Sequence, residues 1–138
     1  MPPKSERSFP QNLEEIDRSF LSALENSCSP ETCYPRAVDG WTAENPLWGH
    51  CAVVAEVVRR NLGGEIVAAT VLTEDGQSYY HYWNRLSDGS DRDFTVTQFP
   101  SPITEVKRLK IKKQITDRET LKRIKIFEEK LSIVLTSE

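Results

Sequence analysis

The sequence GWTAENPLWGHCAVVAEVVRRNL, residues 40–62, decides how the chain is organised. Turn-forming residues directly before Cys51 predict that this cysteine begins a helix. Apolar residues cover most of that helix and Gly63-Gly64 ends it, so we expect a buried central helix over about residues 51–61. A cysteine at a helix start lies near unpaired N–H groups and the positive end of the dipole, which favour the nucleophilic thiolate. The alternative is that Cys51 is a small apolar residue filling a core.

The rest of the chain supplies two more helices and several strands. Periodicity and turn residues predict helices at about residues 12–26 and 117–135, a long loop at 27–49, strands at 65–73, 78–86 and 90–97, and a short edge strand at 106–111. The tight turns between the strands favour an antiparallel meander. The predicted fold class is therefore α+β, with the central cysteine-bearing helix packed on a three- to four-stranded antiparallel sheet and flanked by N- and C-terminal helices.

Length and composition predict one domain. The 138 residues suffice for a single core, which we place at residues 12–138 after a flexible tail at residues 1–11. No apolar run is long enough for a transmembrane helix, and the polar N-terminus does not resemble a signal peptide. We therefore expect a cytoplasmic protein with no membrane partner. The oligomeric state stays open.

The basic residues are concentrated late in the chain. Nine of the eighteen Lys and Arg residues fall between positions 107 and 125. Nucleic-acid binding is one interpretation, but interleaved aromatic residues are missing and the net charge is −3. We expect a solvated basic face and no nucleic-acid partner.

Two further cysteines, Cys28 and Cys33, precede the central stretch. The four residues between them suit neither a redox pair nor a zinc knuckle, for which two residues are usual. We interpret them as loop or packing cysteines, with a regulatory disulfide or a metal site as the alternative.

A nucleophilic thiol needs a base, and turn chemistry places an acid beside one candidate. His81 lies in the second predicted strand. A type I turn at Ser87-Asp88-Gly89, with Gly89 in the left-handed bulge position, pairs Leu86 with Ser90 and brings Asp93 to the face of His81. The sequence thus predicts a Cys51–His81–Asp93 triad. The alternatives are a hydrogen-bonded histidine among aromatic residues and a surface acid near a turn.

Several blocks of the chain resemble a known family. They are Gly40-Trp41-Thr42-Ala43-Glu44-Asn45-Pro46, Trp48-Gly49-His50-Cys51-Ala52-Val53, Gly63-Gly64-Glu65-Ile66, His81-Tyr82-Trp83-Asn84-Arg85-Leu86-Ser87-Asp88-Gly89 and Asp93-Phe94-Thr95. In order and spacing they resemble the bacterial YunG-like family over roughly residues 12–100, and more loosely in the last helix. The family's helix-borne cysteine followed by strand-borne histidine and aspartate is similar to papain-like and transglutaminase-like cores. The resemblance implies acyl transfer through a thioester.

One position departs from the family pattern, which has Gln directly before the cysteine where this chain has His50. Asn45 lies six residues before Cys51, where papain-like enzymes place an oxyanion-binding glutamine, and its amide is a candidate donor. A simple turn role for Asn45-Pro46 is the alternative. We expect His50 near the oxyanion or substrate, and Trp48 and Trp83 along the cleft.

The expected function is that of a thiol hydrolase or acyltransferase acting on a small-molecule or peptide substrate. Cys51 is the expected nucleophile, His81 the general base and acid, and Asp93 the orienting carboxylate. No cofactor and no metal are expected. The alternatives are a binding or regulatory module that keeps the fold without catalysis, and a metal site that uses Cys51 with His50 and His81.

Overall fold

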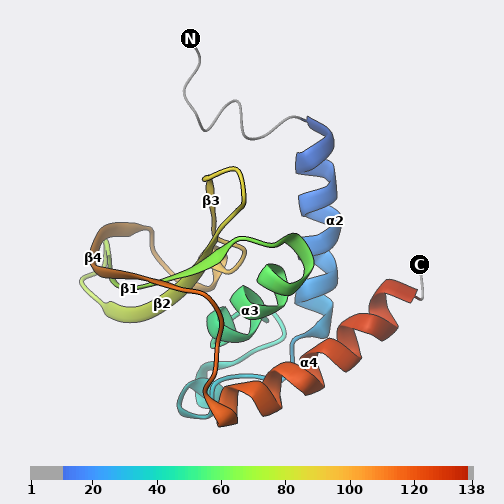
Figure 1. Cartoon of the computed structure of the whole chain (residues 1–138). Helices are drawn as coiled ribbons and strands as arrows, with labels where there is room; N and C mark the ends of the chain where they lie inside the picture. The colour runs from blue at the N-terminus through green and yellow to red at the C-terminus, as the bar shows by residue number, and fades with distance from the viewer. Residues whose placement is uncertain (1–10, 137–138) are drawn as a thin grey trace.

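The computed structural model describes residues 11–136, in which α3 lies between a twisted sheet and the two longer helices (Figure 1). The elements are α2 (Gln11–Ser27), η1 (Pro35–Gly40), α3 (Cys51–Leu62), β1 (Glu65–Thr73), β2 (Ser78–Arg85), β3 (Asp91–Arg92), η2 (Val96–Gln98), β4 (Ile103–Lys112) and α4 (Arg118–Thr136). The α+β class, the antiparallel sheet and the two flanking helices are confirmed. The predicted tail falls on residues 1–10, outside the described residues, and on Gln11, which begins α2.

The sheet has four strands in the order β3-β2-β1-β4, and each neighbouring pair is antiparallel. Strand β1 lies in the middle, and its register with β2 runs from Glu65 opposite Arg85 to Leu72 opposite Ser78. Both strands agree with the predicted ranges to within a residue. The hairpin between them therefore forms as turn chemistry predicts.

The core lies where α3 meets the sheet, α2 and α4. Its fully buried members include Leu24, Val57, Ile66, Ile124 and Phe127. Each such side chain contributes about 1.5–3 kcal/mol by leaving water. The last helix, which periodicity predicts at about residues 117–135, is confirmed as Arg118–Thr136, and its residues Ile124, Phe127 and Leu131 belong to the core.

The third predicted strand, residues 90–97, is wrong in length because only Asp91–Arg92 pairs with β2. The chain leaves the ladder at Asp93, whose Oδ1 accepts the N–H of Thr95 at 3.1 Å. A local bond of this kind competes with strand pairing and bends the backbone. The next three residues, Val96–Gln98, form η2 instead of strand.

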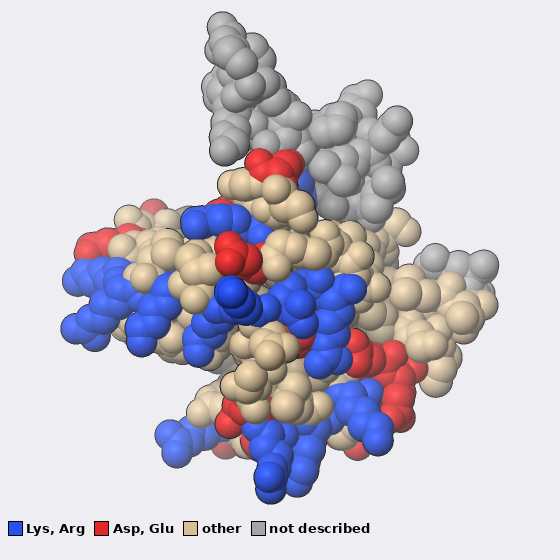
Figure 2. Space-filling model, viewed as in Figure 1, with Lys and Arg blue, Asp and Glu red and all other residues tan. Residues whose placement is uncertain are grey.

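Strand β4 forms one edge of the sheet and is longer than predicted, with register shifts against β1. Its side chains are almost all exposed, and Figure 2 shows Lys and Arg side chains gathered over this strand. A Glu stands among them, since Lys107 Nζ lies 3.3 Å from Glu105 Oε2. Charged side chains on an edge strand oppose pairing with a second sheet.

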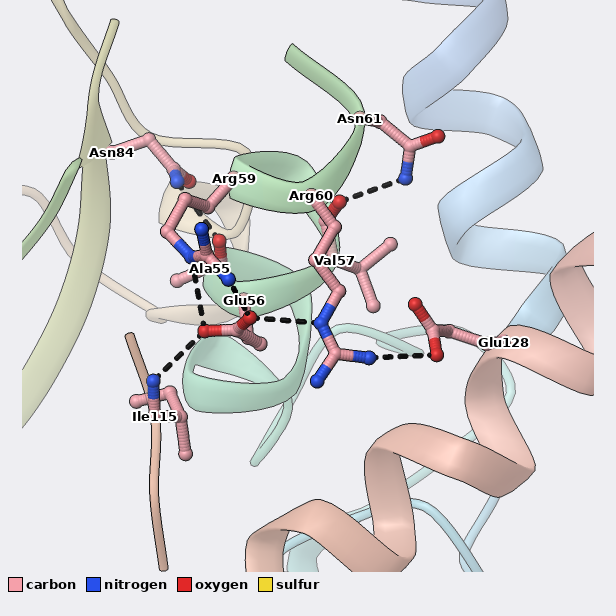
Figure 3. A network of polar contacts seen from close by, with 9 residues as sticks. All are labelled: Ala55, Glu56, Val57, Arg59, Arg60, Asn61, Asn84, Ile115 and Glu128. Carbon is pink, nitrogen blue, oxygen red and sulfur yellow. Dashed lines mark hydrogen bonds and ion pairs between the residues drawn. The ribbon is translucent and has the colours of Figure 1, made fainter. Parts of the chain in front are cut away.

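A buried carboxylate ties α3 to its surroundings (Figure 3). Glu56 Oε1 accepts the backbone N–H of Ile115 at 2.8 Å, and Oε2 accepts Nε of Arg60 at 2.8 Å. Arg60 also reaches Glu128 of α4, while Asn84 of β2 donates to the Ala55 carbonyl at 2.9 Å. These contacts fix α3 against the sheet, α4 and the segment between β4 and α4.

Candidate active site

Cys51 is the first residue of α3, as predicted. The preceding loop arrives there through successive turns, in which Trp48 N–H donates to the Asn45 carbonyl and His50 N–H to the Leu47 carbonyl. Gly49 adopts φ 74°, and a Cβ at this residue would collide with Cys33 Sγ. The loop therefore requires glycine two residues before the thiol.

Cys51 and His81 line one cavity of about 670 Å³. Such a volume lies within the usual range for small-molecule sites. The aromatic residues of its wall are Tyr34, Trp48, Tyr79, Tyr80, Tyr82 and Phe99. Burial, together with the neighbouring Tyr80 and Cys51, raises the pKa of Tyr82 to about 12, so this phenol stays protonated at neutral pH. The wall thus offers apolar rings and hydroxyl groups to a bound molecule.

His81 and Asp93 are brought together by the hairpin between β2 and β3. His81 Nε2 lies 2.7 Å from Asp93 Oδ2. The turn has the predicted form, because Leu86 N–H donates to the Ser90 carbonyl at 2.8 Å and Gly89 has φ 85°. Since a carboxylate only accepts, Nε2 carries the ring proton of the neutral imidazole.

The other ring nitrogen of His81 faces a different environment. The ring is fully buried, and its Nδ1 has no hydrogen-bond partner among the described residues. Burial opposes protonation of the ring, but Asp93 and the neighbouring Cys51 sulfur outweigh it and raise the pKa of His81 to about 9. In its neutral form the ring therefore keeps its proton on Nε2, and Nδ1 is the basic nitrogen near Cys51.

The two predicted tryptophans have different places. Trp48 lines the cavity, with its Nε1 donating to the Ala37 carbonyl at 2.9 Å. Trp83 is not part of this wall. Its Nε1 donates to Asp91 at 3.0 Å and its ring lies 5.7 Å from that of His81, so Trp83 packs behind the imidazole.

Asn45 and His50 are also outside the cavity wall. The Asn45 amide donates to the Gln98 carbonyl at 2.9 Å. His50 is fully buried, with Nδ1 donating to the Trp48 carbonyl at 2.9 Å and Nε2 at 2.7 Å from Thr32 Oγ1. Burial is the main reason that the pKa of His50 falls to about 4, so this ring is neutral. Both side chains fix the loop before Cys51.

Gln98 is a residue of the site that the sequence did not single out. It lines the cavity, is 5% exposed, and accepts the N–H of Gly49 through Oε1 at 3.2 Å. Its Nε2 has no hydrogen-bond partner among the described residues. No local pattern points to it, because its contacts bridge about fifty residues of chain.

The other two cysteines differ from Cys51. Cys28 and Cys33 are free thiols that donate to the carbonyls of Leu24 and Trp48. Burial raises the pKa of both thiols, so they stay protonated. Within residues 11–136 no group of three or more His, Cys, Asp or Glu side chains is arranged to hold a metal ion. In the same range, no helix is long and apolar enough to cross a membrane.

The comparisons with known proteins give one match. No curated protein and no solved structure matches the chain. Residues 17–135 match the family described as YunG protein, which covers the central helix, the sheet and the last helix. The chain therefore belongs to the YunG family.

Proposed function

We propose that this protein is a cytoplasmic thiol enzyme that transfers an acyl group, or hydrolyses an amide or ester, through Cys51, His81 and Asp93. The observation that carries the proposal is the state of His81. Asp93 Oδ2 lies 2.7 Å from Nε2, while the buried Nδ1 has no hydrogen-bond partner among the described residues. The neighbouring Cys51 raises the pKa of the same ring. An unpaired buried nitrogen is costly, and a use in proton transfer explains why it is kept.

In the first half-reaction, His81 Nδ1 takes the proton of the Cys51 thiol. The sulfur then attacks a carbonyl carbon of the substrate, so that a C–S bond forms and the π electrons move to oxygen. When the C=O bond re-forms, the bond to the leaving group breaks, and the leaving group takes the proton from His81. Asp93 stabilises the imidazolium throughout.

In the second half-reaction, water or an amine gives its proton to His81 and attacks the thioester. The C–S bond breaks, the acyl product leaves, and the sulfur regains its proton from His81. The arrangement of a cysteine at a helix start, followed by histidine and aspartate on a hairpin, resembles papain-like and transglutaminase-like cores. The cytoplasmic setting is part of the proposal, since three free thiols persist where thiols stay reduced.

A pH series of thiol alkylation tests the proposal. We expect iodoacetamide to modify Cys51 of the wild type at pH 6–7, because in the proposed mechanism His81 takes the thiol proton and so produces the nucleophilic sulfur. In His81→Ala the reaction should need the alkaline pH of an ordinary thiol. Cys28 and Cys33 serve as internal controls, and peptide mass spectrometry separates the three sites.

If the two pH profiles coincide, the proposal is wrong. The aromatic cavity wall then favours the second candidate, a module that binds a small molecule without turnover. Such a module would bind its ligand equally well in the wild type and in Cys51→Ala.

A further inference from the structure

Gln98 combines three properties that seldom occur together in a buried side chain. It is 5% exposed, it lines the cavity that holds Cys51 and His81, and its amide nitrogen has no hydrogen-bond partner among the described residues. Leaving a buried donor unpaired costs about 1–3 kcal/mol. Holding the loop at Gly49 requires only the acceptor Oε1. That role alone does not explain why the side chain also carries a buried N–H donor.

The orientation of the amide follows from its contact with Gly49. The Gly49 N–H can only donate, so the atom that it meets at 3.2 Å must be the oxygen of Gln98. The amide nitrogen Nε2 is therefore the atom of this side chain that has no hydrogen-bond partner among the described residues. Because both amide atoms are bonded to one carbon, Nε2 also lies close to the loop that leads into Cys51.

The backbone of Gln98 is held by two hydrogen bonds of its own. Its carbonyl accepts the Asn45 amide at 2.9 Å, and its N–H donates to the Thr95 carbonyl at 3.0 Å. Backbone and side chain of Gln98 are thus each fixed by hydrogen bonds before any substrate binds. Such preorganisation is what makes a donor effective toward charge that develops in a transition state.

We infer that Gln98 Nε2 and the backbone N–H of Cys51 together donate to the oxyanion of the substrate carbonyl. The Cys51 N–H is available because the first N–H groups of a helix have no partner within it. In this arrangement Asn45 is a positioning residue that acts through Gln98. The inference rests on the proposed function, and it restricts the substrate to carbonyl compounds such as amides, esters and thioesters.

Two reagents separate this role from that of the triad. Acylation by p-nitrophenyl acetate passes through an oxyanion, whereas alkylation by iodoacetamide displaces iodide from carbon and forms none. We expect Gln98→Met to lower the rate of Cys51 acylation by about 10²–10³-fold, the usual effect of losing one such donor. The alkylation rate should stay within about twofold of the wild type.

Gln77→Met is the matched control, because Gln77 is an exposed glutamine outside the wall of this cavity. It should leave both rates unchanged. Should Gln98→Met fail to fold, Gln98→Glu keeps an acceptor for Gly49 N–H and removes the donor. In Gln98→Glu, the ratio of the Cys51 acylation rate to the Cys51 alkylation rate should fall as it does in Gln98→Met.

The outcomes are distinguishable. Acylation of Gln98→Met at the wild-type rate, in a protein whose Cys51 is acylated in a His81-dependent manner, overturns the inference alone. An equal slowing of both reactions also overturns it, because Gln98 would then act on the thiol and not on the oxyanion. Failure of the wild type to be acylated overturns the proposed function and this inference with it.

Discussion

Helix α3 carries a buried carboxylate, Glu56, in its middle and a thiol, Cys51, at its start, and the surroundings of these two groups differ. Both oxygens of Glu56 accept hydrogen bonds, from Ile115, Arg59 and Arg60 (Figure 3). Burial alone would raise the pKa of Glu56, but these three partners lower it below its ordinary value. The carboxylate is therefore a satisfied structural group.

At the start of α3, two buried polar atoms have no hydrogen-bond partner among residues 11–136. Nδ1 of His81 and Nε2 of Gln98 are buried near Cys51, and neither has a hydrogen-bond partner in the part of the chain that the structure describes. One helix thus joins a fully paired region to a region with unused donors and acceptors. Because stability favours pairing every buried polar atom, the unpaired end is where function is expected.

Asp93→Asn should have the largest effect. Since Asp93 Oδ1 accepts the Thr95 N–H, an asparagine would place its oxygen there and turn its amide toward His81. That donor would force the ring into the opposite tautomer, with the proton on Nδ1. We expect Cys51 acylation to fall by about 10²–10⁴-fold, measured by p-nitrophenolate release.

Stability should change little in this variant, which urea unfolding would check. Acylation at the wild-type rate would show that the tautomer of His81 is irrelevant and would remove Asp93 from the site.

Glu56→Ala should lower the stability of the protein and leave the reactivity of Cys51 unchanged, the reverse of what we expect for Asp93→Asn. It orphans the Ile115 N–H and leaves a cavity, so we expect the free energy of unfolding to fall by about 3–4 kcal/mol. The measurement is urea unfolding. Alkylation of Cys51 in the still-folded protein should proceed at the wild-type rate. A large drop in alkylation with little loss of stability would contradict the division of α3 into a structural middle and a functional start.

The sequence predicted the half of the site that local rules control. The bulge at Gly89 and the alternation of β2 sufficed to put Asp93 beside His81, because both lie on one hairpin. The same rules extended the third strand too far, since they do not register the bond from Asp93 to Thr95. Gln98 was missed because its partner Gly49 is distant in sequence, and such contacts leave no periodic pattern.

Glu56 was missed for a related reason. The helix was predicted from its apolar surface, and one carboxylate among valines gives no sign that Ile115 will lie opposite it. The amide of Asn45 was predicted at the oxyanion, but it lies outside the cavity wall and donates to the carbonyl of Gln98. Tertiary contacts between separate elements decided each of these positions.

His50 provides a pH-dependent test of the loop before Cys51. The unfolded chain binds a proton at this residue below about pH 6.5, the folded chain only below about 4, so stability is lost as the pH falls between these values. That gap corresponds to roughly 3 kcal/mol. In His50→Gln the loss between pH 7 and 4 should be smaller, as measured by urea unfolding at each pH. Parallel curves for the two proteins would contradict a buried neutral ring.

The smallest effect is expected where the Glu56 network reaches the surface. Arg60 Nη1 lies 2.8 Å from Glu128 Oε1, and both side chains are 37% exposed, whereas the side chain of Glu56 is 1% exposed. An exposed pair contributes about 0–1 kcal/mol because water and salt compete for both charges. Glu128→Ala should therefore lower the free energy of unfolding by less than about 1 kcal/mol. If the effect of Glu128→Ala equals that of Glu56→Ala, then the attachment to α4, and not burial of the carboxylate, fixes this part of α3.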